Sequence, residues 1–104
     1  MAKSEFSIRM DYKNAIKQAE KLEDTADKIK RTAKNDLDDC INRINSAWDG
    51  DSSNRFCRKG YTVVDELEVI AQELRRTAET IRKIATNTYN ADMRALDIAK
   101  SRNY

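Results

Sequence analysis

The residue types that interrupt secondary structure are nearly missing from this chain. Its 104 residues contain no proline and only two glycines, Gly50 and Gly60. Tight turns, hairpins and strand corners depend on these residue types, so the composition argues against an all-β or α/β fold. Charged residues make up 37% of the chain and hydrophobic residues 39%, a balance typical of long amphipathic helices. We therefore expect a single all-α domain over residues 1–104.

The spacing of apolar residues predicts a first helix over about residues 11–47. Small and apolar side chains recur there at steps of three and four residues, which is the repeat of one helix face. Asp11 is the expected N-cap of this helix, because its carboxylate can accept hydrogen bonds from the first free backbone amides. The alternation of Phe6, Ile8 and Met10 with polar residues predicts an extended arm before it. After Ala33 the steps of four residues resemble a stutter, which locally unwinds a coiled coil.

A second helix is predicted over about residues 52–98, followed by a short tail from Ser101 to Tyr104. Apolar and small positions alternate there at four and three residues without interruption. The large side chains among them are the predicted seam of the core and of a dimer: Phe56, Val63, Leu67, Ile70, Leu74, Ile81 and Ile84. A second row repeats every seven residues beside this seam and widens the apolar face: Val64, Ala71, Ala78 and Ala85.

These two helices are predicted to fold back on each other as an antiparallel helix-turn-helix hairpin, with the turn at residues 48–50. Gly50 is placed to supply the positive φ that ends a helix. Gly60 lies on the seam, where its missing side chain lets the facing helix approach. Two helices alone make a thin core, and the apolar face is wider than one partner helix covers. We therefore expect the hairpin to dimerise into a four-helix bundle.

Both cysteines lie near the predicted turn, at similar distances on either side of it. Cys40 and Cys57 would then face each other across the hairpin and could form a disulfide in an oxidising exterior. The alternative is a pair of small, partly buried apolar residues with free thiols. Both interpretations stay open at this point. No metal site is expected, because two cysteines without histidine fill only half of a tetrahedral zinc shell.

The composition also argues against several classes of function. The chain has no histidine, the commonest general base and metal ligand, and no phosphate-binding glycine loop. We therefore expect no enzymatic activity, no cofactor and no small-molecule substrate. The net charge is only +2, with both signs spread along the chain, which argues against nucleic-acid binding. The start of the chain has no apolar run long enough for a cleaved signal peptide.

The motif Trp48-Asp49-Gly50 lies near the middle of the chain, between the two predicted helices. In a chain of this length without histidine or proline, it resembles the WXG-motif family. These are small ESAT-like proteins exported by the type VII secretion systems of Gram-positive and mycobacterial cells. Phe56, six residues after the motif glycine, is similar to the family pattern, and so is the Ile8-Arg9-Met10 segment.

The resemblance implies a secreted substrate or effector without enzymatic activity, which acts in virulence or interbacterial competition. It implies a dimer, either of this chain with itself or with a sibling WXG protein, that a type VII membrane ATPase recognises. Trp48, Asp49 and Gly50 would belong to the surface used in export. The protein would be cytoplasmic before export and would leave the cell without cleavage of a signal peptide.

Many members of this family also carry a tyrosine followed four residues later by an acidic residue, after the second helix. Here Tyr89 is followed by Asp92 one position too early, so these two residues form a degenerate version of that export signal. A literal match, from Tyr61 to Asp65, lies at the start of the second helix and is interpreted as ordinary helix surface. The departure favours an alternative role, a targeting partner that binds the helical N-terminal domain of a larger LXG-type toxin.

Overall fold

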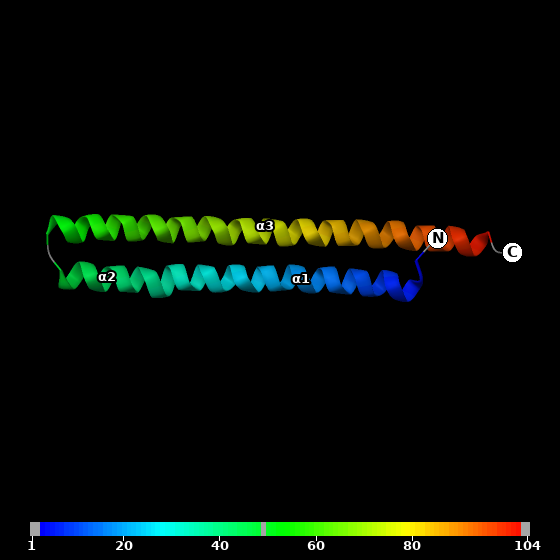
Figure 1. Ribbon diagram of the computed structural model, residues 1–104, viewed down its shortest axis with the longest axis horizontal. Coiled ribbons are helices and arrows are strands. Elements are labelled where there is room, and N and C mark those ends of the chain that lie inside the picture. Colours follow the sequence, from blue (N-terminus) through cyan, green and yellow to red (C-terminus); the bar gives the residue numbers. More distant parts are fainter. Residues whose placement is uncertain (1–2, 49, 103–104) are drawn as a thin grey trace. The chain divides into compact units, whose positions relative to one another are not determined.

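The computed structural model describes residues 3–48 and 50–102, and nearly all of them are helical. Helix α1 spans Glu5–Arg31, the π-helix η1 spans Thr32–Leu37, α2 spans Asp38–Ala47 and α3 spans Asp51–Ser101 (Figure 1). The predicted all-α fold is confirmed for these residues. Contacts within the chain divide it into two compact units. Unit 1 comprises described residues 3–22 and 76–102, and unit 2 comprises 23–48 and 50–75.

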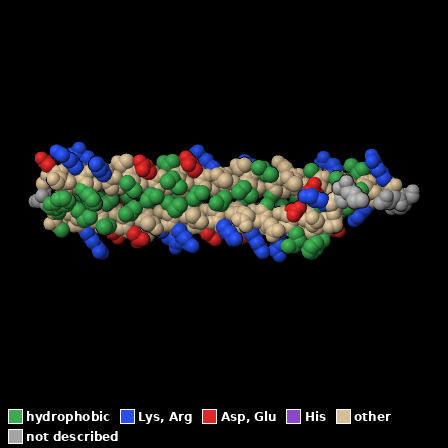
Figure 2. Space-filling model, viewed as in Figure 1, with side chains coloured by type: hydrophobic (Ala, Val, Ile, Leu, Met, Phe, Trp, Pro, Cys, Tyr) green, Lys and Arg blue, Asp and Glu red, His purple; other side chains and the backbone are tan. Residues whose placement is uncertain are grey.

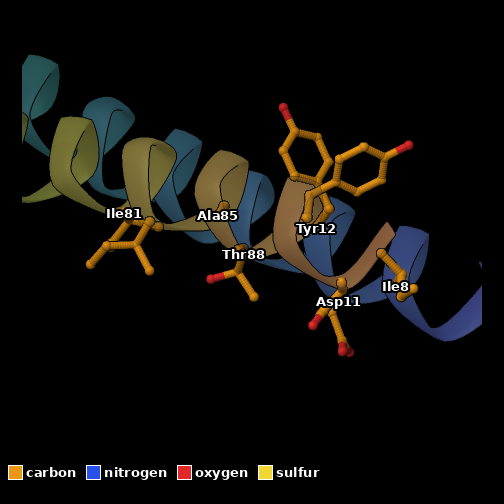
Figure 3. Close-up of a pocket in the computed structure, with 10 residues that line it drawn as sticks. Ile8, Asp11, Tyr12, Ile81, Ala85 and Thr88 are labelled. Atoms are coloured by element: carbon orange, nitrogen blue, oxygen red, sulfur yellow. The ribbon is translucent and has the colours of Figure 1, made fainter. Parts of the chain in front are cut away.

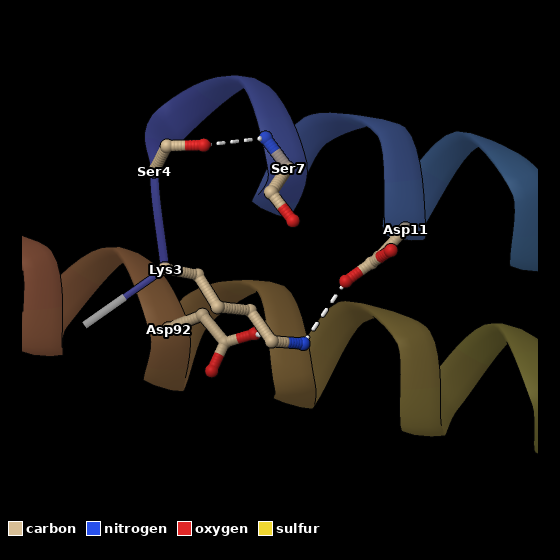
Figure 4. Close-up of polar contacts among 5 residues, drawn as sticks. All are labelled: Lys3, Ser4, Ser7, Asp11 and Asp92. Carbon is tan, nitrogen blue, oxygen red and sulfur yellow. Dashed lines mark hydrogen bonds and ion pairs between the residues drawn. The ribbon is translucent and has the colours of Figure 1, made fainter. Parts of the chain in front are cut away.

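Helix α1 begins six residues earlier than predicted, at Glu5. Ser4 is its N-cap: the Ser4 Oγ accepts a hydrogen bond from the Ser7 amide at 3.1 Å (Figure 4). The Ser4 carbonyl accepts another from the Ile8 amide at 3.0 Å. Asp11, the predicted N-cap, therefore lies inside the helix, and that prediction is wrong.

The predicted extended arm is also wrong, because residues 6–10 belong to α1. Of the three apolar residues that alternate there, Ile8 alone is buried, with 1% of its surface exposed. Phe6 is 75% exposed and Met10 is 38% exposed. The short alternating pattern was therefore coincidental. Ile8 is instead part of a helical repeat that continues through Tyr12 and Ala15.

Replacing Ser4 with Ala is expected to loosen the first turn of α1, since the cap hydrogen bond is lost. A lost N-cap typically costs about 1 kcal/mol of local stability. Faster amide hydrogen exchange in the first turn would report the loss. Ser7→Ala is the matched control, because Ser7 contributes its backbone amide to this bond and not its side chain. An equal effect of both substitutions would contradict the capping role.

Small side chains fill the space between the helices. The buried apolar residues of unit 2 come from the helical segments on both sides of the turn: Ala26, Ala33, Ile41, Cys57, Val64 and Ala71. Those of unit 1 are Ile8, Ala19, Ala78 and Ala85. Along α3 these buried residues repeat every seven positions. Within each unit the helices can therefore approach closely where alanines face each other.

The predicted seam is not the row that lies between the helices. Four of its members are largely exposed: Phe56 (49%), Val63 (46%), Ile70 (44%) and Ile84 (59%). The other three, Leu67, Leu74 and Ile81, are half-buried at the edge of the interface. The row that the sequence placed beside the seam, Val64 to Ala85, is the one that lies between the helices. As a hairpin core the seam prediction was wrong for the four exposed residues.

The stutter predicted after Ala33 corresponds to the π-helix η1. A π-helix accommodates one extra residue per turn relative to an α-helix. Counting seven residues from the buried Ala33 leads to Cys40, but the next buried residue is Ile41, with 4% exposure. The inserted residue is thus absorbed within η1, and α2 presents Ile41 to α3 in place of Cys40.

Candidate functional site

The turn contains the tryptophan-glycine motif. Trp48 ends α2 in an extended conformation, with φ −131° and ψ 115°, and its amide donates to the Ile44 carbonyl at 2.9 Å. Gly50 has φ +119°, the positive value predicted for it. The Gly50 carbonyl accepts from the Asn54 amide at 3.1 Å and so begins α3. Asp49 lies outside the described residues.

Trp48 does not cover the end of the core as a buried cap would. Its side chain is 49% exposed, so half of the residue's surface is open to solvent or to a partner. Trp48 directly follows α2 and its amide is bonded to that helix, so Trp48 is held at a defined place on unit 2.

Two contacts near the turn join α2 to α3 in unit 2. The Tyr61 hydroxyl donates a hydrogen bond to Asn42 Oδ1 at 2.6 Å, so this tyrosine links α3 to α2. A Cβ atom built on Gly60 would lie 2.6 Å from Ile41 Cδ1 and 2.9 Å from Ile41 Cγ1. The close approach predicted at Gly60 is therefore confirmed, and Ile41 is the residue that occupies the space.

Both cysteines carry free thiols and differ in their surroundings. Cys57 is buried, with 6% exposure, and its Sγ lies 3.8 Å from the Ile41 carbonyl oxygen. Cys40 is exposed. The residue that packs against Cys57 is thus Ile41, whereas the sequence placed Cys40 there.

The two residues of the degenerate export signal lie on α3 in unit 1, and both make contacts with the start of the chain. The Tyr89 ring stacks at a tilt of 54° on Tyr12, with centroids 5.2 Å apart. The Asp92 Oδ2 lies 3.8 Å from the Lys3 Nζ. The same Nζ donates to the Asp11 Oδ2 at 2.9 Å (Figure 4). These contacts connect the predicted signal to the N-terminal segment.

Charged groups at this end shift one another's proton affinity. The hydrogen bond from Lys3 to Asp11, together with the charges of Asp11 and Asp92, raises the pKa of the Lys3 ammonium. A hydrogen bond from Arg9 at 2.8 Å lowers the pKa of the Glu5 carboxyl and raises that of Arg9 itself. Asp92 is half-buried and the other side chains are exposed, so the pairs orient the start of α1 and add little stability.

Beside these groups, unit 1 has an open groove of about 210 Å³ with a mainly apolar lining (Figure 3). Ile8, Ala15, Ile81 and Ile84 provide apolar surface. Asp11, Thr88 and Asp92 provide the polar groups of the lining. Ile8 and Ile84 differ sharply in exposure, at 1% and 59%, so the groove leads from the buried row of unit 1 to its surface.

Large exposed hydrophobic side chains share one heptad position along α3. We call this row the outer stripe. Its large members are Phe56, Val63 and Ile70 in unit 2, and Ile84 and Ile98 in unit 1. Phe56, Val63, Ile70 and Ile84 each directly precede one of the buried residues of α3. On the viewed face in Figure 2, hydrophobic side chains gather over α2 and the start of α3.

The described residues, 3–48 and 50–102, were searched for a cluster of metal ligands and for a membrane-spanning helix. No group of three or more metal-ligating side chains is placed there to hold an ion. The same residues include no helix with the length and apolar character needed to cross a membrane. No family model matches the chain, and neither a curated protein nor a solved structure is significantly similar to it.

Proposed function

We propose that this protein is a small WXG-type substrate or effector of a type VII secretion system, that it has no enzymatic activity, and that it works as a dimer of helical hairpins. The motif supports the assignment, because Trp48 and Gly50 join two helices in the conformation that such a turn requires. The dimer is supported by a separate observation, the exposure of the outer stripe.

The outer stripe carries the argument for a partner. Small residues, alanine above all, make up much of what the helices bury within each unit, while Phe56, Val63 and Ile70 remain 44–49% exposed. Burying such a side chain completely stabilises an assembly by about 1.5–3 kcal/mol relative to full exposure. Contiguous apolar surface of this kind marks a protein-protein interface. A four-helix bundle of two copies would cover it.

The order of residues along the outer stripe favours a second copy of the chain. From Phe56 to Ile98 the stripe is nearly symmetric about Thr77 in side-chain size. If α3 of one copy runs antiparallel to α3 of the other, Ile70 in unit 2 meets Ile84 in unit 1 of the partner. Phe56 then meets Ile98 in the same way. An interface of this kind is self-complementary, as a two-fold dimer requires.

Export is proposed to use the exposed part of Trp48. Trp48→Ala is therefore expected to abolish most secretion while the helices remain intact, because Trp48 is at the end of α2 and is 49% exposed. Immunoblots of culture supernatant and cell fractions measure secretion, and circular dichroism measures helicity. Phe6→Ala is the matched control, since Phe6 is an aromatic residue that is 75% exposed in unit 1. Unchanged secretion of the Trp48 variant would contradict the proposal.

A targeting partner for an LXG-type toxin is the second candidate. It is favoured by the irregular spacing of Tyr89 and Asp92 and by their contacts with Tyr12 and Lys3. The test is co-expression with the helical N-terminal domain of a toxin encoded beside this protein, followed by light scattering on the purified material. A stable heteromer that replaces self-association would support the targeting role. A dimer of this chain that excludes the toxin domain would support the first proposal.

A further inference from the structure

Two features of unit 2 bear on the surroundings of Cys57, and neither has a part in the proposed function. One is the π-helix η1, and the other is the presence of a second cysteine, Cys40, in the helix that follows it. Cys57 is buried against α2 and Cys40 is exposed. The residue of α2 that contacts Cys57 is Ile41, whose carbonyl oxygen lies 3.8 Å from the Cys57 Sγ.

The position of η1 explains why Cys40 is exposed. In an uninterrupted α-helix, a residue seven positions after the buried Ala33 returns to the same face. That residue is Cys40, so a regular helix would point it toward Cys57. The extra residue in η1 delays the return by one position. Cys40 is then rotated by about 100° away from the interface, the angle between successive residues of an α-helix.

We propose that η1 keeps the two thiols apart, so that the hairpin retains the same pairing of α2 and α3 in reducing and in oxidising surroundings. A disulfide needs its two Cβ atoms about 3.5–4.5 Å apart with suitable direction. Cys40 does not meet the second condition, because it is exposed while its neighbour Ile41 occupies the inward position. This role concerns the fold of unit 2 and holds whether or not the protein is exported.

The packing around Ile41 stabilises this arrangement over the regular helix. Ile41 belongs to a buried cluster with Ala33, Cys57 and Val64, and Leu37 packs against the cluster. Its side chain also occupies the space left by Gly60. If residues 32–37 formed a regular α-helix of the same length, Cys40 would take the inward place of Ile41 and the carboxylate of Asp36 would take that of Leu37. The interface would lose apolar contact and take up a charge, which opposes a shift toward the disulfide-competent arrangement.

The test compares the wild-type chain with the double variant Cys40→Ser, Ile41→Cys, which moves the thiol by one residue without changing the length of η1. Both proteins are equilibrated with oxidised and reduced glutathione in fixed ratios. In the reaction measured, two protein thiols and one oxidised glutathione give one internal disulfide and two reduced glutathione molecules. Alkylation after unfolding, followed by intact-mass measurement, counts the remaining thiols.

We expect the double variant to form the internal disulfide at glutathione ratios where Cys57 of the wild type remains a thiol. Oxidation of both proteins to the internal disulfide at the same ratio would overturn the proposal. Failure of the double variant to oxidise would also overturn it, because Ile41 would then not occupy the position facing Cys57.

A second variant tests η1 directly. Insertion of one alanine between Leu37 and Asp38 places Cys40 eight residues after Ala33. In the wild type this is the distance at which η1 turns Ile41 inward. The insertion variant is therefore expected to pair Cys40 with Cys57. Deletion of Asn35, an exposed residue of η1, is the control: Ile41 then lies seven residues after Ala33 and stays inward in a regular α-helix, so this variant is expected to remain a dithiol. An insertion variant that retains wild-type helicity by circular dichroism and forms no internal disulfide would contradict the role of η1. The double variant described above stays informative if the insertion variant does not fold.

Discussion

Replacement of Ile70 by Glu is expected to convert the dimer to a monomer at micromolar concentration. Ile70 is a central member of the outer stripe and is 44% exposed in the single chain. A two-fold dimer carries the substitution twice, and each Ile70 can bury only its exposed 44%, so the lost burial amounts to about 1.3–2.6 kcal/mol. At about 1.4 kcal/mol for each factor of ten, the dissociation constant should rise by at least one to two orders of magnitude, and the buried glutamate charge adds to this rise. Sedimentation equilibrium would measure the change.

The neighbouring residue provides the matched control for this experiment. Val69 is 52% exposed, yet it lies outside the outer stripe, one helix position away from Ile70. Val69→Glu introduces the same charge beside the same backbone and is expected to leave the dimer intact. Equal dissociation by both substitutions would show that added charge, and not the stripe, accounts for the effect. A monomeric wild-type chain at micromolar concentration would contradict the homodimer itself.

Ile41→Ala is expected to produce the largest loss of stability in unit 2. Ile41 is 4% exposed and is the largest member of the buried cluster around Cys57. Truncation of a buried isoleucine to alanine typically costs about 2–5 kcal/mol. Urea unfolding followed by circular dichroism, at one fixed protein concentration, would measure the loss. Cys40→Ala, one residue earlier and exposed, is the control and should change stability very little.

Gly60→Ala gives a sharper check on the contact between Gly60 and Ile41. Its effect on the free energy of unfolding should differ between the wild type and the Ile41→Ala variant. In the wild type, Gly60→Ala gains about 1 kcal/mol of helix propensity. It also brings a methyl group to 2.6 Å from Ile41 Cδ1, and overpacking costs about 1–3 kcal/mol. We expect no net gain there. In the Ile41→Ala background the clash is absent, so Gly60→Ala should stabilise. Additive effects in the double-mutant cycle would contradict the contact.

Apolar spacing and the two glycines predicted much of this fold. The two helical regions, the turn at residues 48–50, the positive φ of Gly50 and the close approach at Gly60 were all predictable. Each depends on local chemistry: helix periodicity, the conformational freedom of glycine, or the absence of a Cβ atom. The start of α1 was missed, because Ser4 was not considered as a cap and three alternating apolar residues were given too much weight.

The inward row could not be chosen from spacing alone. On α3 two neighbouring rows both repeat every seven residues, and both are apolar. The row with the larger side chains, from Phe56 to Ile84, was predicted to form the core seam. The structure buries the smaller row, because small residues let two helices approach until little surface between them remains exposed. The size of the side chains therefore decided the outcome, and the more hydrophobic of the two rows is the one left exposed.

The candidate site was predicted only in part. The motif was recognisable from its place between two helices, and its backbone conformation followed from Gly50. The contacts of Tyr89 with Tyr12 and of Asp92 with Lys3 depend on how the two helices pair in unit 1. The exposure of Cys40 depends on η1, which the sequence indicated only as a stutter. Long-range pairing and helix type therefore account for what was missed.

The alanine rows have a consequence for how the chain selects its alignment. Alanine has no side-chain rotamers to restrict, so these rows pack at no cost in side-chain entropy. For the same reason they carry almost no information about alignment, since one alanine fits opposite another after a shift of a full heptad. Alignment in unit 2 must come from pairs of unlike residues, among them Ile41 with Gly60, Tyr61 with Asn42, and Arg75 with Asp27. Removing these three should weaken the preference of the two helical segments for a single register.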